Sequence, residues 1–201
     1  METNSKTVAT ALLIMDIQPG TMQMLGGAAA AAPLVNALRQ AIQAARASSI
    51  PVIYVVVGFR EGFPEVSSYN KGFSAIRQGG GFPGLVDPQP DPAVAPQPGD
   101  MIVTKRRVSA FAGSDLEVIL RAHRIDHLVL TGIATSGVVL STIREAADRD
   151  YKLTVLSDAC ADRDLEVHGV LLGKVFPRQA DVVTAAEWAA GLAGSTVDAS
   201  S

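Results

Sequence analysis

Short apolar runs alternate with amphipathic segments along most of this chain. Mostly apolar runs at 11–17, 52–57, 100–104 and 128–130 are typical of strands that helices cover on both faces. Two further strands are predicted at 152–156 and 181–184. Helical spacing follows five of the six strands, at 33–47, after Ser114, at 139–149, at 164–175 and at 185–192. This order predicts an α/β fold with three α/β/α layers, doubly wound and Rossmann-like around a six-stranded, mostly parallel sheet.

The segment 127–160 carries the clearest strand, turn and helix pattern. An apolar run leads into small residues at 132–137, and helical spacing follows. One face of that helix is apolar, formed by Val139, Ile143, Ala146 and Ala147. A turn in this position lies at the carboxyl edge of a parallel sheet, where unpaired helix amides hold an anion or oxyanion. If the protein has an active site, we expect it at this turn.

The segment 58–99 lacks regular spacing and has six prolines between Pro83 and Pro98. Long irregular segments within a domain are usually either walls of an active site or disordered inserts. Its aromatic residues, Phe59 among them, favour packing, so the segment is predicted to form a wall of the active site.

The helix at 33–47 is predicted to begin at Pro33. Its buried side is predicted to consist of Leu34, Leu38, Ala41, Ile42 and Ala45.

Composition narrows the class of protein. With 201 residues, 48% hydrophobic and 18% charged, the chain suits one soluble globular domain, residues 1–201, with frayed tails at 1–9 and 194–201. A net charge of -3 argues against nucleic acid or an anionic membrane as a partner. Residues 1–10 lack an export signal, and no apolar run is long enough to span a bilayer. The single cysteine excludes an internal disulfide and is compatible with a cytoplasmic location.

Charged residues come at the ends of two predicted strands, just as the small-residue turn comes at the end of a third. Asp16 follows the first strand and Lys105 follows the third. Because parallel strands end at one edge, both side chains are predicted to converge near the turn. A solvated ion pair of little energetic value is an equally open interpretation. Met22, shortly after Asp16, either lines a pocket or fills the core.

The stretches ALLIMDIQ, KRRVSAF and LVLTGIATSGVVLSTIREAADRDYKLTVLSDAC, in this order and spacing, resemble the isochorismatase-like hydrolases, also called the cysteine hydrolase superfamily. The likeness runs from Thr10 to Glu187 and implies the isochorismatase-like fold. It implies that Asp16 and Lys105 are catalytic. It also implies a cis peptide bond between Ile133 and Ala134, with an oxyanion hole formed by backbone amides near Ala134 and position 138.

The chain departs from this family at the nucleophile. Val138 stands where the family has its cysteine, and valine has no lone pair with which to attack a carbonyl. Ser136 is expected to cap the following helix, Ser141 lies a turn further on, and no histidine is evidently placed to activate either hydroxyl. Cys160, in the segment SDAC, is more typical of a small buried hydrophobe than of a catalytic thiol.

The resemblance leaves three functions open. The first follows true isochorismatases, which hydrolyse a vinyl ether without the cysteine: Asp16 acts as the acid, and Lys105 orients the carboxyl group or the substrate. The second is a catalytically silent protein that binds a small molecule or serves as an assembly subunit. The third is an amide hydrolase that uses water activated by Asp16.

Binding residues and partners complete these expectations. A small, carboxylated substrate is expected, and Arg60 is a candidate for its carboxylate. The predicted substrate-binding residues are Gln18, Met22, Phe59, Arg60, Phe111 and Thr135. No metal site is expected, because the three histidines lack metal-ligand spacing, and no cofactor is implied. Family members commonly form homo-oligomers, so a dimer or tetramer is expected.

Overall fold

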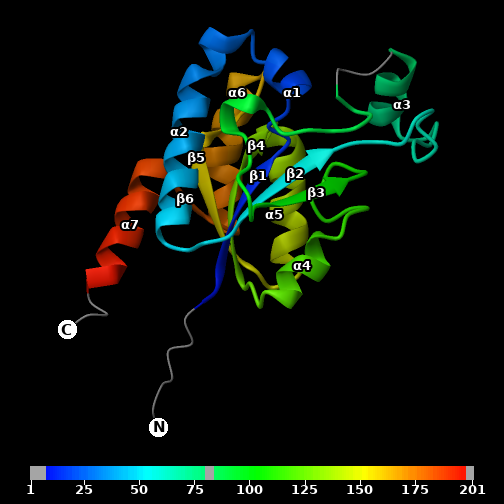
Figure 1. Ribbon diagram of the computed structural model, residues 1–201. Helices are drawn as coiled ribbons and strands as arrows, with labels where there is room; N and C mark the ends of the chain where they lie inside the picture. The colour runs from blue at the N-terminus through cyan, green and yellow to red at the C-terminus, as the bar shows by residue number, and fades with distance from the viewer. Residues whose placement is uncertain (1–7, 80–83, 198–201) are drawn as a thin grey trace.

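The computed structural model describes residues 8–79 and 84–197 and contains one six-stranded sheet (Figure 1). The strand order is β3-β2-β1-β4-β5-β6, and every neighbouring pair is parallel. The strands are β1 Thr10–Met15, β2 Val52–Val57, β3 Met101–Lys105, β4 His127–Ile133, β5 Lys152–Ala161 and β6 Asp181–Val183. The predicted doubly wound α/β fold is confirmed, and the sheet is wholly parallel.

Helices cover both faces of this sheet. The α-helices are α1 Pro19–Gln23, α2 Ala28–Ala47, α3 Lys71–Gln78, α4 Leu116–Ala122, α5 Leu140–Ala147, α6 Leu165–Val170 and α7 Ala185–Val197. Figure 1 shows α2 and α7 on one side of the sheet and α4 and α5 on the other. Short helical turns add η1 Pro92–Val94, η2 Thr135–Val139, η3 Leu171–Val175 and η4 Phe176–Arg178.

The alternation of side chains along β1 divides the core into two clusters. Leu12 and Ile14 pack with Leu38 of α2, whereas Leu13 and Met15 pack with Ile143 of α5. Successive strand residues point to opposite faces of a sheet, so the nearly continuous apolar run of β1 serves both layers. The predicted buried sides of α2 and α5 are confirmed, except that Ala147 is only partly buried.

Two local predictions were wrong. Helix α2 begins at Ala28, so Pro33 lies inside it rather than at its start. The alanines before Pro33 have the highest helix propensity, which offsets the missing proline amide. The segment 58–99 is also more regular than predicted, since it contains α3 and η1. Asn70 caps α3 by accepting a hydrogen bond from the Phe73 amide at 3.1 Å, a local start signal that the sequence does contain.

The chain ends differ slightly from expectation. Helix α7 continues to Val197, past residue 194, where a frayed tail was expected. The expected tail at 1–9 falls mostly outside the described residues, as does the stretch from 198 onward. In the described part of the chain, no helix combines the length and apolarity needed to cross a bilayer.

Candidate active site

Two strand ends bring a carboxyl group and an ammonium group into contact. Asp16 follows β1 with a φ of 54°, a left-handed conformation that aspartate tolerates better than most residues. Lys105 is the last residue of β3. Lys105 Nζ lies 2.9 Å from Asp16 Oδ2, and the two residues are only 1% and 7% exposed. The predicted convergence is confirmed, and the alternative of a solvated ion pair is wrong because both groups are buried.

The Lys105 ammonium has all its donors in use. Besides Asp16, it donates to the carbonyl oxygens of Arg107 at 2.9 Å and Val108 at 3.0 Å. An ammonium group has three hydrogens, so these three acceptors satisfy it fully. Lys105 therefore orients the Asp16 carboxyl group and has no hydrogen left for a substrate.

The second oxygen of Asp16 is chemically different from the first. Oδ1 is buried and has no hydrogen-bond partner among the described residues. Burial raises the pKa of Asp16 above its ordinary value, although the charge and hydrogen bond of Lys105 act in the opposite direction. Because Oδ2 accepts from Lys105, Oδ1 is the oxygen on which a retained proton would lie.

Gln18 holds the end of β1 against β2. Its side chain is fully buried, donating from Nε2 to the Val57 carbonyl at 3.2 Å and accepting at Oε1 from the Val57 amide at 2.8 Å. Thr21 of α1 accepts from the Gln18 amide at 3.1 Å and donates to the Asp16 carbonyl oxygen. Gln18 was predicted to contact substrate, and in the structure its side-chain amide joins two strand ends.

The expected turn follows β4. The bond between Ile133 and Ala134 is cis, as the resemblance implied, and η2 begins immediately after it. Gly132 precedes this bond with a φ of 146°, and a side chain there would collide with the Met15 carbonyl oxygen of β1. Val138 is 2% exposed and belongs to the apolar cluster that includes Ile143, so an apolar side chain lies where the resemblance places the nucleophile.

Two side chains from beyond β5 bind the turn. Thr135 Oγ1 lies 2.8 Å from His168 Nδ1 of α6, and the Ser136 amide donates to Asp162 Oδ2 at 2.7 Å. The predicted helix cap by Ser136 was wrong, since no side chain caps η2 or α5. His168 does reach a hydroxyl of the turn, that of the fully buried Thr135. The 33-residue separation gave no sequence signal for this pair.

The hydrogen bond from Ser136 also lowers the pKa of Asp162. Partial burial acts to raise its pKa, but hydrogen bonds from Ser136, Asp164 and Arg163 hold it below the ordinary value. The carboxylate also accepts from the Asp164 amide at 3.2 Å. The negatively charged Asp162 carboxylate therefore lies at the start of η2.

Three predicted substrate-binding residues contact partners within the chain. Phe59 is 3% exposed and packs edge-on against Phe73 at 5.3 Å between ring centroids. Phe111 stacks on Tyr151, which lies just after the C-terminal end of α5. Arg60 is largely exposed and bound to Glu65 at 2.7 Å. Each of these three predicted residues therefore has a partner within the chain: an aromatic ring for Phe59 and Phe111, and a carboxylate for Arg60.

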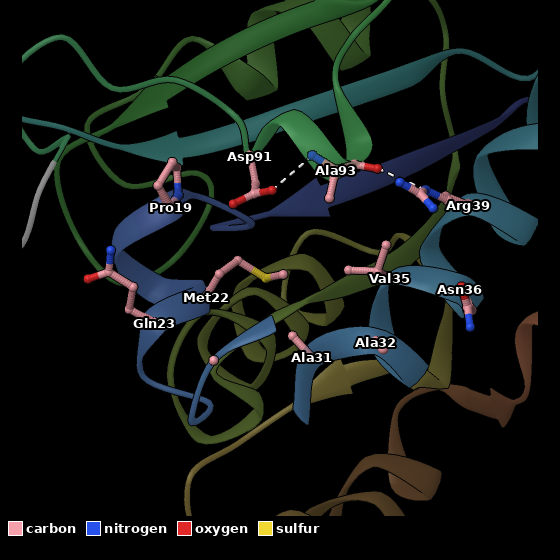
Figure 2. A pocket seen from close by; sticks show the side chains of 11 residues that line it. Pro19, Met22, Gln23, Ala31, Ala32, Val35, Asn36, Arg39, Asp91 and Ala93 are labelled. Carbon is pink, nitrogen blue, oxygen red and sulfur yellow. Dashed lines mark hydrogen bonds between the residues drawn. The ribbon is translucent and has the colours of Figure 1, made fainter. Parts of the chain in front are cut away.

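Met22 lines a hollow of about 430 Å³ between α1, α2 and the segment at 91–93, seen from close by in Figure 2. Neither Asp16, Lys105 nor Val138 lines this hollow. Met22 also packs against the core cluster under α2, so both interpretations of this residue, pocket wall and core filler, apply.

Cys160 has the properties of a structural residue. It lies within β5, is 5% exposed, and burial raises the pKa of its thiol to about 12. A thiol with that pKa is almost wholly protonated at neutral pH, and the protonated form is a poor nucleophile. Within residues 8–79 and 84–197, no group of three or more His, Cys, Asp or Glu side chains is arranged to hold a metal ion.

Comparisons with known proteins agree with this geometry. The Isochorismatase domain model matches residues 10–187. The chain is 33% identical over 188 residues to the uncharacterized isochorismatase family protein YecD of Escherichia coli O157:H7, covering 90% of this chain and 94% of that protein. It is 34% identical over 179 residues to the ureidoacrylate amidohydrolase RutB of Stutzerimonas stutzeri, covering 77% and 70% of the two chains.

Solved structures give the same assignment. An isochorismatase family protein from Burkholderia thailandensis superimposes with a TM-score of 0.77 at 31% identity, covering 92% of this chain and 95% of that one. The N-carbamoylsarcosine amidase from Thermoplasma acidophilum superimposes with a TM-score of 0.71 at 27% identity, covering 89% and 97%. Named members of this group are hydrolases. The chain belongs to the isochorismatase family.

Proposed function

We propose that this chain hydrolyses a small, carboxylated vinyl ether by acid catalysis from Asp16, without a covalent intermediate. The observation that supports the proposal is the state of Asp16 Oδ1, which is buried and unpartnered in the described part of the chain, on a carboxyl group whose pKa is raised by burial. Such a group keeps its proton to a higher pH than an exposed aspartate. Val138 leaves no side chain able to attack the substrate from the family's nucleophile position.

The proposed reaction balances with water as the only co-substrate. Asp16 transfers its proton to the terminal carbon of the vinyl group, and the π electrons form the new C–H bond. The adjacent carbon becomes an oxocarbenium ion, which water attacks. The proton lost by that water returns to the Asp16 carboxylate, and the hemiketal collapses to a ketone and an alcohol.

Lys105 has a positioning role in this scheme. Its contact with Asp16 Oδ2 at 2.9 Å stabilises the carboxylate that remains after proton transfer. Because its other two hydrogens bind backbone carbonyls, the substrate carboxylate needs a different cation. We assign that role to Arg60, whose guanidinium is 70% exposed and would exchange its present partner, Glu65, for the substrate.

The test is hydrolysis of isochorismate and of simpler carboxylated vinyl ethers in D₂O. The proposal expects one deuterium in the methyl group of the ketone product, because the acid protonates carbon. Asp16→Asn should abolish turnover, whereas Asp87→Asn, at an exposed site, should leave it unchanged. Turnover by Asp16→Asn at the parent rate, or product without deuterium, overturns the proposal.

A second candidate is a binding protein without turnover. Asp16, Lys105 and Val138 are 7%, 1% and 2% exposed, so the reacting groups are covered by the chain's own atoms. This function predicts that carboxylated vinyl ethers raise the melting temperature while no product forms. Detectable product that depends on Asp16 excludes it.

A third candidate is amide hydrolysis by water that Asp16 activates. The relatives named ureidoacrylate amidohydrolase and N-carbamoylsarcosine amidase favour a carbon–nitrogen bond as the target. Here Asp16 acts as a base, so the rate should rise with pH where the acid mechanism falls. Turnover of a ureido substrate that survives Cys160→Ala together with Ser136→Ala supports this function.

We also propose an oligomeric state and a cellular location for this chain. We place a single domain in a homo-oligomer, a dimer or tetramer, in the cytoplasm. All six strands share one sheet, and the single cysteine is buried and reduced. Light scattering of the purified chain tests the oligomer, and limited proteolysis that yields one stable core tests the single domain.

A further inference from the structure

The hollow beside α1 has the size and lining of a small-molecule site. Its volume of about 430 Å³ lies within the range of pockets that enclose small ligands. Apolar side chains form its walls, and Figure 2 shows Met22 of α1 and Val35 of α2 pointing toward one another across the space. Pro19 and Ala31 extend the same apolar lining. A ligand that fills the hollow must therefore present a mostly apolar body.

One edge of the hollow carries a positioned cation. Arg39 Nε donates to the Ala93 carbonyl oxygen at 2.9 Å, which fixes the plane of the guanidinium. Its two terminal nitrogens have no partner within residues 8–79 and 84–197. A guanidinium held in this way presents a fork of N–H groups that matches the two oxygens of a carboxylate.

The same edge also limits the charge of the ligand. Figure 2 shows Asp91, Ala93 and Arg39 in a row, with Asp91 Oδ1 accepting from the Ala93 amide at 2.9 Å. The Asp91 carboxylate repels a second negative charge, so one carboxylate fits this edge better than two. The charges therefore select a monocarboxylate.

Asp16, Lys105 and Val138 do not line this hollow. Met22 packs against the core cluster under α2 and α7, whereas Val138 belongs to the cluster under α4 and α5. The hollow and the nucleophile position are therefore on opposite faces of the sheet. We infer that the chain has a second binding site, between α1, α2 and η1, for a small apolar molecule with one carboxylate, held by Arg39. The inference goes beyond the proposed function and does not depend on it.

The test uses 3-phenylpropionate as the probe and 3-phenylpropionamide as its uncharged match. With the methionine methyl groups labelled with ¹³C, titration should shift the Met22 signal, which Met22→Leu identifies. The amide should bind about tenfold more weakly, as should the acid with Arg39→Gln, since both lose the charge-assisted pair. Arg178→Gln, at an exposed arginine outside the hollow, is the matched control and should bind like the parent.

Two further variants keep the outcome decisive. Ala32 lines the hollow at an exposed position of α2, so Ala32→Trp fills the hollow without disturbing the core and should abolish the Met22 shift. Light scattering and the melting temperature check that this variant keeps the parent assembly and fold. Asp16→Asn should bind normally. Loss of binding in Asp16→Asn, equal affinity for acid and amide, or an unshifted Met22 signal overturns the inference.

Discussion

Lys105 Nζ lies 2.9 Å from Asp16 Oδ2 across the width of β2, and both groups are buried. Removing one member of such a pair leaves the other without its counter-charge. We expect Lys105→Met to lower the free energy of unfolding by about 3 kcal/mol. The double variant Lys105→Met with Asp16→Asn should recover part of this loss. Urea unfolding measures both, and Lys174→Met, at an exposed lysine, should change little. A strictly additive double variant would show that the two side chains do not interact.

The pH dependence of vinyl-ether hydrolysis should follow Asp16. Burial raises its pKa above the ordinary value, so the protonated acid persists above pH 4 and is lost as the pH rises through the raised pKa. We expect kcat/KM to be flat below that pKa and to fall about tenfold per pH unit above it. Initial rates over a range of pH measure this. A rate that rises with pH would favour Asp16 as a base.

Val138→Cys should place a thiol where the resemblance puts the family's nucleophile. In a Cys160→Ala background, we expect the new thiol to react with iodoacetamide and ureido substrates to be hydrolysed at least about tenfold faster than by the parent. Mass spectrometry of the alkylated protein and ammonia release measure the two effects. The parent protein, whose buried Cys160 thiol has a pKa of about 12, serves as the unreactive control. Unreactivity of the new thiol would mean that the turn does not activate position 138.

Gln18→Ala should act on stability and not on substrate affinity. The Gln18 amide satisfies both backbone groups of Val57, which would be left buried and unpaired. We expect a loss of about 2 kcal/mol in the free energy of unfolding, with KM unchanged. Gln40→Ala, at an exposed position of α2, is the matched control. A raised KM at unchanged stability would instead restore the substrate contact that the sequence predicted.

His127 should make the fold less stable in mild acid. Its ring nitrogens lie 3.0 Å from Thr10 Oγ1 and 2.9 Å from Thr154 Oγ1. Burial, aided by Lys152 and opposed by Asp181, lowers its pKa from 6.5 to about 4. Between these values the unfolded chain binds a proton that the folded chain does not, so stability falls as the pH falls.

We expect this effect to be about 1 to 2 kcal/mol between pH 7 and pH 4, because solvent screens a ring that is only partly buried. Urea unfolding at several pH values measures it. His127→Gln keeps a neutral hydrogen-bonding side chain and should flatten this part of the curve. Parallel curves for the parent and the variant would show that His127 does not titrate as described.

The pattern of apolar runs was enough to predict the sheet and the contact between Asp16 and Lys105. Apolar runs long enough for strands buried on both faces required helices on either side, and parallel strands necessarily end at one edge. Asp16 and Lys105 were therefore expected to meet at this edge, and the structure confirms their contact, with the end of β4 beside the end of β1. The prediction that Val138 stands in place of the family's nucleophile likewise came from the sequence.

The partner of each side chain near the site, by contrast, depends on how distant segments pack together. Gln18 joins two strand ends, Phe111 stacks on Tyr151, and Thr135 meets His168, because partners distant in the sequence compete for every hydrogen bond and contact. The protonation of Asp16 was likewise undetermined by sequence, since burial and the Lys105 charge act in opposite directions and only packing sets how much water is excluded. Periodicity records which face of an element is buried, whereas the identity of its neighbour depends on the whole fold.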